Sequence, residues 1–478
     1  MLATLALATA LVTTDAAVLR AAPRDSAQQQ AELWQGELLE VRGEKLDWLQ
    51  VWDTRRERGG YVRASHMRRV AADAKEAPEL LAVLRFVREA PGAEALGIGL
   101  AGAWVQAAAP EAVRGEAGVE VLDAIGTLAD RLAQRASSGA TLSRNAQAAA
   151  AAHLEVVAQY GVRFASYERE GRMQVCYDGD AFRRVLALEA HPAQRARAAL
   201  ALTRSECMDP NLQPLARHQV TLWRADVLDR VPSAQLPAYV KNRVAMRRAA
   251  VWSTLAYEHA RLGEPAAQAA ARRALQELAA VQRAELPEED AALYNEAVMR
   301  VNASRWAAVA DAPPAPAANR PSIVTVRGQP GETCVLLVDG RNDMARPLAR
   351  RCTYSLVWPQ SATLNREGNA LALAVQPREA WRELWLFRKS AAGWAIDVLP
   401  PSSLAPELGY AEFAGWVPGG RQVLVAREAR GEGRYRRNFE VVSLESLTVQ
   451  RQTGDPSMLG PFQRWQDAGW KRTTVSLR

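Results

Sequence analysis

Cysteine and histidine are the side chains in this sequence best suited to nucleophilic or metal chemistry, and both are scarce. The 478-residue chain contains four cysteines and five histidines. The cysteines form two local pairs, Cys176 with Cys207 and Cys334 with Cys352, and proximity favours these disulfides over the other two possible pairings. Four buried thiols are the alternative. A zinc site at the cysteines is not expected, because there is no Cys-x-x-Cys and no nearby histidine at ligand spacing.

The histidines do not form a recognisable metal-binding or catalytic pattern in the sequence either. They lie far apart in sequence, and none has a histidine or carboxylate partner at ligand spacing: His66, His153, His191, His218 and His259. We therefore predict no metal site, no catalytic residue and no cofactor. The glycine motif GIGLAG, residues 97–102, matches a dinucleotide-binding pattern, but such a pattern must follow a strand. Both flanks here are alanine-rich and helical in pattern, which favours close helix packing.

The bulk composition indicates a multidomain globular protein. A chain of 478 residues exceeds the roughly 250–300 residues at which single cores stop growing. Hydrophobic residues make up 49%, yet no apolar run reaches the ~18 residues of a membrane-spanning helix. The net charge of +7 falls entirely in residues 320–478, with 22 Lys and Arg against 15 Asp and Glu. These charges are diluted along the segment, so we expect a solubilising surface and no nucleic-acid partner.

The first residues resemble an export signal. The signal-like segment, residues 1–15, begins with a short apolar run that ends in Ala8-Thr9-Ala10, which has the small-x-small form of a signal-peptidase site, although the usual basic residue at the start is missing. A disordered alanine-rich terminus is the alternative. Paired cysteines are typical of oxidising compartments. We therefore expect a periplasmic or secreted protein.

Residues 16–70 have the pattern of short strands. The runs AVLRAAP, GELLEVRGE, DWLQVWD and GGYVRASHM are bounded by glycine or charged turns, which predicts a small β-barrel. Val18-Leu19-Arg20 with Pro23, Gly36, Trp48 and Gly60-Tyr61-Val62 occur in the order found in bacterial SH3 (SH3b) domains, and the segment resembles that family over about 55 residues. The resemblance implies binding to a cell-wall component or to protein.

Within DWLQVWD, the two-residue period of a strand separates two faces. Leu49 and Val51 share one face, while Trp48, Gln50 and Trp52 share the other. If the first pair fills the barrel, two tryptophans flank a glutamine on the outside. We predict that these three residues and Tyr61 bind a ligand, because exposed aromatic residues rimmed by polar groups mark contact surfaces. The alternative is that this face packs against the helical region that follows.

Residues 75–310 are rich in Ala, Leu, Arg and Glu with a 3.6-residue period, which predicts about ten helices in antiparallel pairs. One interruption, residues 161–177, alternates around Glu170-Gly171 and predicts a hairpin that Cys176 ties to the helix ending near Cys207. The Pro/Ala-rich segment 311–321 reads as a semi-rigid linker and as the clearest domain boundary.

Residues 322–478 again have a strand-like pattern, and part of this pattern occurs twice. Two stretches spaced about 50 residues apart share one order of strands and glycine turns, as in propeller blades. Trp416, Pro418, Gly419 and Gly420 occupy the turn of the repeats in TolB-type periplasmic β-propellers, which this part resembles. A third, shorter blade would place Cys334 and Cys352 on neighbouring strands. Three blades are too few to close, so the domain stays open, closes with the C-terminal strand, or is completed by a partner.

The sequence thus predicts a multidomain α plus β protein with an SH3-like β-barrel, a central all-α array and a C-terminal antiparallel β-domain with propeller-blade-like repeats. We expect a non-enzymatic binding or scaffold protein whose partner is a protein or peptidoglycan. A cell-envelope hydrolase with an unrecognised site among the helices is the alternative, and a cytoplasmic regulator using the basic C-terminal face is a third hypothesis. The sequence does not indicate the oligomeric state.

Overall fold

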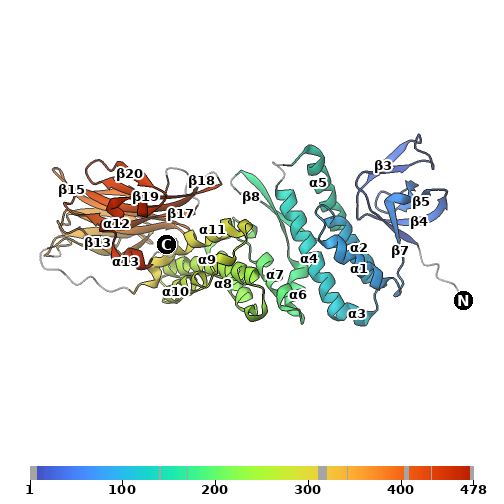
Figure 1. The fold of residues 1–478 in the computed structure, drawn as a ribbon, viewed down its shortest axis with the longest axis horizontal. Helices are drawn as coiled ribbons and strands as arrows, with labels where there is room; N and C mark the ends of the chain where they lie inside the picture. Colours follow the sequence, from blue (N-terminus) through green and yellow to red (C-terminus); the bar gives the residue numbers. More distant parts are fainter. Residues whose placement is uncertain are drawn as a thin grey trace. The chain divides into compact units, whose positions relative to one another are not determined.

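The structure is a computed structural model in which the chain forms two compact units (Figure 1). It describes residues 8–138, 142–169, 171–310, 320–341, 343–402, 408–431 and 433–473. Unit 1 comprises Met1–Leu212 and Val231–Gln235, and unit 2 comprises Gln213–Arg230 and Leu236–Arg478. The division falls inside the predicted helical domain 75–310, so the helices are shared between the units. Most of the predicted linker 311–321 lies outside the described residues.

Unit 1 begins with strands and continues with helices. Its strands are β1 (Thr9–Val12), β2 (Ala17–Arg20), β3 (Gln29–Leu33), β4 (Leu38–Lys45), β5 (Trp48–Asp53), β6 (Arg58–Arg63), β7 (Met67–Val70), β8 (Phe164–Arg169) and β9 (Arg172–Tyr177). Its helices are α1 (Ala77–Arg88), α2 (Glu94–Ala107), α3 (Pro110–Arg114), α4 (Glu116–Ser137), α5 (Arg144–Ala158), α6 (Asp180–Ala187), α7 (Pro192–Leu202) and the 3₁₀ helix η3 (Ser205–Cys207).

The first seven strands form one antiparallel sheet in the order β3-β2-β6-β5-β4-β1-β7. Apolar residues from β1 to β6 meet in a single core that includes Leu19, Leu49, Val51 and Val62, so the sheet curves around its own inner face. Leu49 and Val51 therefore point inward, as predicted. The pairing among the described residues runs from one edge strand to the other, and the predicted closed barrel is not formed.

Residues 9–12, which belong to the predicted signal-like segment 1–15, are part of this sheet. β1 lies between β4 and β7, with Ala10, Leu11 and Val12 fully buried. Farther along, Asp15 accepts a hydrogen bond of 2.7 Å from Nε2 of the buried His153. Cleavage after Ala10 would cut through β1 and remove Thr9 and Ala10, which pair with both β4 and β7. Residues 1–7 lie outside the described part of the chain.

The helices of unit 1 approach one another and the sheet through glycines of α2. A side chain at Gly97 would meet Leu128 of α4, one at Gly99 would meet the backbone of Gly36, and one at Gly102 would meet the ring of Tyr160. The GIGLAG motif therefore lies inside a helix and serves close packing, as predicted. No helix in the described ranges is both long enough and apolar enough to cross a bilayer.

Unit 2 begins with its longer helices, continues with strands and ends with two short helices. Its helices are α8 (Pro214–Asp229), α9 (Ala238–Leu262), α10 (Ala266–Ala279), α11 (Ala291–Ser304), α12 (Gly460–Trp465) and α13 (Ala468–Thr473), together with the 3₁₀ helix η7 (Arg305–Ala308). Its strands are β10 (Ser322–Arg327), β11 (Thr333–Val338), β12 (Ala349–Thr353), β13 (Leu356–Leu364), β14 (Ala370–Arg378), β15 (Trp381–Ser390), β16 (Gly393–Leu399), β17 (Leu408–Val417), β18 (Gln422–Gly431), β19 (Arg434–Ser443) and β20 (Val449–Thr453).

The two predicted repeats form two four-stranded antiparallel arrays, β13 to β16 and β17 to β20. A short parallel pairing of β15 with β17 joins them into one eight-stranded sheet, and the described residues do not form a propeller. β10, β11 and β12 make a separate three-stranded sheet with Cys334 opposite Cys352, as predicted. One alternative was closure by a C-terminal strand over residues 472–477. Arg472 and Thr473 belong to α13, and residues 474–477 lie outside the described part of the chain.

A buried group of charges joins the helices of unit 2 to the sheet. The carboxylate of Glu412 on β17 lies 2.7 Å from Nη2 of Arg305 in η7 and also contacts Arg382 of β15. All three side chains are almost fully buried. Arg382 also donates a 2.7 Å hydrogen bond to the backbone oxygen of Asn302 in α11. Burial lowers the pKa of Arg382 to about 10, so the guanidinium stays charged at neutral pH.

We expect the native protein to retain the residues of β1. Mass spectrometry of the N-terminal peptide of protein isolated from its own host should find a chain that still contains Thr9 to Asp15. The physical reason is that β1 supplies hydrogen bonds to two neighbouring strands. A mature chain that starts at Leu11 would contradict this structure of the sheet.

Replacing Glu412 by glutamine should lower the free energy of unfolding of unit 2 by about 3–5 kcal/mol, because two buried guanidinium groups lose their counter-charge. Denaturant unfolding of the full chain measures this. The matched control is Asp226→Asn on α8, which removes an exposed ion pair with Arg230 and should cost less than about 1 kcal/mol. Equal effects of the two substitutions would contradict the role of Glu412.

The free energies of unfolding of the wild type and of Glu412→Gln should also depend differently on pH. Burial raises the pKa of Glu412, but the two guanidinium groups outweigh it and hold the pKa below its ordinary value of 4.5. A carboxyl group with a lowered pKa stabilises the fold above its ordinary pKa, and this contribution is lost as the pH falls through the folded-state pKa. The stability difference between the wild type and Glu412→Gln should therefore be constant at neutral pH and shrink below about pH 4.5.

Candidate functional site

The predicted contact residues lie together on the outer face of the N-terminal sheet. In the register of β5 with β6, Trp48 lies opposite Arg63, Gln50 opposite Tyr61 and Trp52 opposite Gly59. Residues that face each other across antiparallel strands project to the same side of the sheet. The structure thus brings Trp48, Gln50, Trp52 and Tyr61 onto one surface, which we call the β5–β6 face.

Arginines cover both tryptophans of this face. The guanidinium of Arg63 lies 4.4 Å from the ring centre of Trp48, and that of Arg42 lies 4.4 Å from the ring centre of Trp52. Such contacts are worth about 0.5–1 kcal/mol when exposed. Arg63 also contacts the carboxylates of Asp25 and Asp47, which fix its position over the ring. The sequence reasoning did not include these arginines.

The four predicted residues differ in accessibility. Gln50 is exposed, Trp52 and Tyr61 are half-buried, and Trp48 is only 3% exposed because of its covering arginine. Trp48 is therefore less accessible than the strand pattern predicts. The accessible part of the face presents the indole of Trp52, the phenol ring of Tyr61, the amide of Gln50 and guanidinium groups.

The helices of unit 1 contact another part of the sheet. α2 packs on β1, where Leu11 joins the helical core together with Trp34 and Leu38. The phenol of Tyr160, which follows α5, donates a 2.6 Å hydrogen bond to the backbone oxygen of Gly36. None of the four predicted residues belongs to this core within the described ranges. The apolar contacts between the helices and the sheet in this core thus do not include the β5–β6 face.

The histidines are less isolated than their positions in the sequence suggest, which corrects that prediction. Besides the contact of His153 with Asp15, Nδ1 of His218 lies 2.9 Å from Glu258, and Nδ1 of His259 contacts Glu264. The rings of His218 and His259 meet edge to face, with centroids 5.0 Å apart. The proximity of His218 and His259 could not be predicted, because forty residues separate them in the sequence. The short spacing of His259 and Glu264 around Gly263, by contrast, could have indicated their contact.

Unit 2 also contains a cavity of about 300 Å³ beside α11 and the strands β18 and β19. Its walls mix apolar and charged side chains, and the guanidinium of Arg283 lies 5.5 Å from the ring centre of Tyr294. Burial raises the pKa of Tyr294, so its hydroxyl is protonated at neutral pH. The lining residues are Arg283, Leu286, Pro287, Glu288, Ala291, Tyr294, Asn295, Val298, Glu428 and Arg437.

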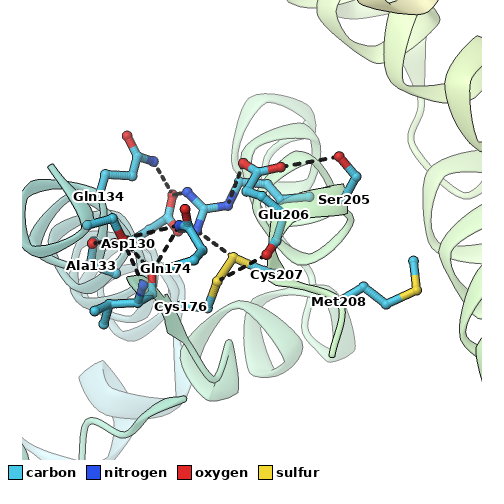
Figure 2. The surroundings of a disulfide bond; sticks show 12 residues. Asp130, Ala133, Gln134, Gln174, Cys176, Ser205, Glu206, Cys207 and Met208 are labelled. Carbon is cyan, nitrogen blue, oxygen red and sulfur yellow. Dashed lines mark hydrogen bonds and ion pairs between the residues drawn. A yellow bond between two sulfur atoms is a disulfide. The ribbon is translucent and has the colours of Figure 1, made fainter. Parts of the chain in front are cut away.

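All four cysteines are in disulfides, with the predicted pairing. Cys176 of β9 is bonded to Cys207 of η3, and Figure 2 shows this bond beside Asp130 and Gln134 of α4. Arg204 lies 3.1 Å from Asp130 and donates a 2.9 Å hydrogen bond to the Cys207 sulfur, which anchors η3 to α4. The hairpin of β8 and β9 forms as predicted.

The second disulfide prevents metal binding by the residues around it. Glu332, Cys334 and Cys352 lie close enough to share an ion, but the two sulfurs are bonded to each other and are not available as thiolate ligands. No cysteine remains as a nucleophile. Two disulfides in one chain fit folding in an oxidising compartment.

Comparison with protein-family models, with curated proteins and with solved structures gave no match for this chain. The resemblances to SH3b domains and TolB-type repeats therefore stay predictions. The site has to be judged on its own geometry.

Replacing Cys176 and Cys207 together by serine should lower the free energy of unfolding of unit 1 by about 2–4 kcal/mol, since the bond closes a loop between residues 31 apart. Denaturant unfolding measures the loss. The matching double substitution of Cys334 and Cys352 should act on unit 2 instead. A thiol-alkylating reagent should label the denatured wild type only after reduction, and labelling without reductant would contradict both bonds.

Proposed function

We propose that this protein is a non-enzymatic binding protein of the periplasm or the extracellular space, and that the β5–β6 face contacts a protein partner. The observation that carries the proposal is the position of Gln50, Trp52 and Tyr61 on a face that the helices of unit 1 leave uncovered. An uncovered group of aromatic residues on a folded sheet is a recurrent feature of interaction sites.

The residue types favour a protein over a polysaccharide partner. Tryptophan, tyrosine and arginine are the residues most enriched at the energetic centres of protein interfaces. Sugar rings, by contrast, would need open indole faces on which to stack, and here Arg63 and Arg42 lie over those faces. Their guanidinium groups offer several hydrogen-bond donors at the edge of an apolar patch, which suits backbone carbonyls and carboxylates of a partner.

The proposed location rests on the disulfides, because such bonds persist outside the reducing cytosol. Binding is favoured over thiol-based hydrolysis since no free cysteine remains. The resemblance of the N-terminal part to SH3b domains and of the C-terminal part to TolB-type repeats supports binding to cell-envelope proteins.

A photo-crosslinking amino acid at the exposed position Gln50 should give discrete protein adducts in cells of the native host. The same probe at Phe86 on α1, which is 81% exposed, is the matched control and should not give those adducts. Adding Tyr61→Ala to the Gln50 probe should reduce the adducts, because truncating an interface centre typically weakens binding by tenfold or more.

Two outcomes would contradict this proposal. One is an identical adduct pattern from Gln50 and Phe86. The other is protein that sediments with purified peptidoglycan and loses this property in Tyr61→Ala, which would assign the face to the cell wall. Trp465→Ala, at an exposed tryptophan of α12 in unit 2, controls for the loss of an aromatic residue elsewhere.

A further inference from the structure

Three side chains of unit 2 bring metal-binding atoms together. His218 stands in the second turn of α8, His259 in the last turn of α9, and Glu264 directly after that helix. One nitrogen from each histidine and one carboxylate oxygen of Glu264 all lie within 4.8 Å of one another. The histidines are buried and Glu264 is exposed, so the group opens to solvent on one side.

The end of α9 is built so that His259 and Glu264 meet. Gly263 has the left-handed conformation, with φ of 72°, and its N–H donates to the oxygen of Ala260 at 3.1 Å. The N–H of Glu264 then donates to the oxygen of His259 at 2.9 Å. These two bonds define a Schellman motif, in which the chain reverses and the residue after the glycine returns to the last helical turn.

His218 is held from its other side. Oε2 of Glu258 lies 2.9 Å from Nδ1 of His218, and Oε1 of the same carboxylate accepts a 3.2 Å hydrogen bond from Thr221. With Nδ1 engaged by a carboxylate, Nε2 of His218 is the nitrogen left for a ligand. Metal-binding histidines regularly have such a carboxylate on the nitrogen that does not touch the metal, because it fixes the ring and raises its basicity.

We propose that His218, His259 and Glu264 bind a divalent transition metal, with Zn²⁺ as the best fit. Two imidazoles and one carboxylate form a ligand set that suits zinc, whereas calcium and magnesium prefer oxygen ligands alone. Three protein ligands leave a fourth position for water or for a group of a bound partner. The site lies outside the proposed contact face and does not depend on it.

The donor atoms need only a modest adjustment to close around the ion. In a tetrahedral zinc site with bonds of about 2.0–2.1 Å, neighbouring donor atoms lie about 3.4 Å apart. The side chain of Glu264 is solvent-exposed, and the ion would replace its direct contact with His259. Because His218 comes from the start of α8 and the other two ligands from the end of α9, binding joins these two helix ends.

The test is zinc binding to untagged, full-length protein that has been dialysed against EDTA. Competition with a chromophoric chelator should give one Zn²⁺ per chain, and Zn²⁺ should raise the melting temperature of the metal-free protein, since a ligand that binds only the folded state stabilises it. Co²⁺ at the same site should give the visible absorption bands of a tetrahedral complex. Glu258→Gln should weaken Zn²⁺ binding by about 10–100-fold.

His218→Gln and His259→Gln should abolish both the stoichiometric binding and the melting-temperature shift. His66→Gln, at a half-buried histidine of unit 1, is the matched control and should change neither. Circular dichroism of each metal-free variant checks that it is folded, and cobalt spectra of the single variants give an independent reading if one variant is destabilised. The proposal is overturned if the wild type binds no Zn²⁺, or if His218→Gln and His259→Gln bind it as the wild type does.

Discussion

The buried carboxylate of Glu412 is the contact on which the architecture of unit 2 depends. It faces two guanidinium groups, one from the segment after α11 and one from β15, in surroundings that exclude water. Burying such charges costs several kcal/mol each, so the arrangement persists only if all three partners are present together. The need for all three charged side chains fixes the position of the segment after α11 relative to β15 and β17. It also explains why the compact unit extends across the Pro/Ala-rich segment that separates the helices from the strands in the sequence.

In unit 1, small residues instead of buried charges allow the helices to pack on the sheet. Glycines of α2 let the helix come within contact of Gly36, Leu128 and Tyr160, and β1 extends the sheet toward the helices. Because the helices settle on that side, the β5–β6 face stays open. The proposed contact surface is thus a consequence of where the helices pack as much as of its own residues.

The two proposed sites use different chemistry in separate units. The β5–β6 face offers aromatic rings and guanidinium groups on a stiff sheet, which suits a macromolecular partner. The histidine group at the ends of α8 and α9 offers neutral nitrogen and carboxylate ligands, which suits a metal ion. The disulfides withdraw all four thiols from nucleophilic chemistry.

Features that depend on local pattern could be predicted from the amino-acid sequence. The order of β, α and β regions, the inward direction of Leu49 and Val51, the helical GIGLAG motif, the hairpin before Cys176 and both disulfides follow from periodicity and short spacing. Tertiary structure alone decided which strands join and which side chains meet. β1 was hidden because a short apolar strand and a signal segment have the same composition, and the meeting of His218 with His259 was hidden because a helix pair, and no sequence motif, sets their distance.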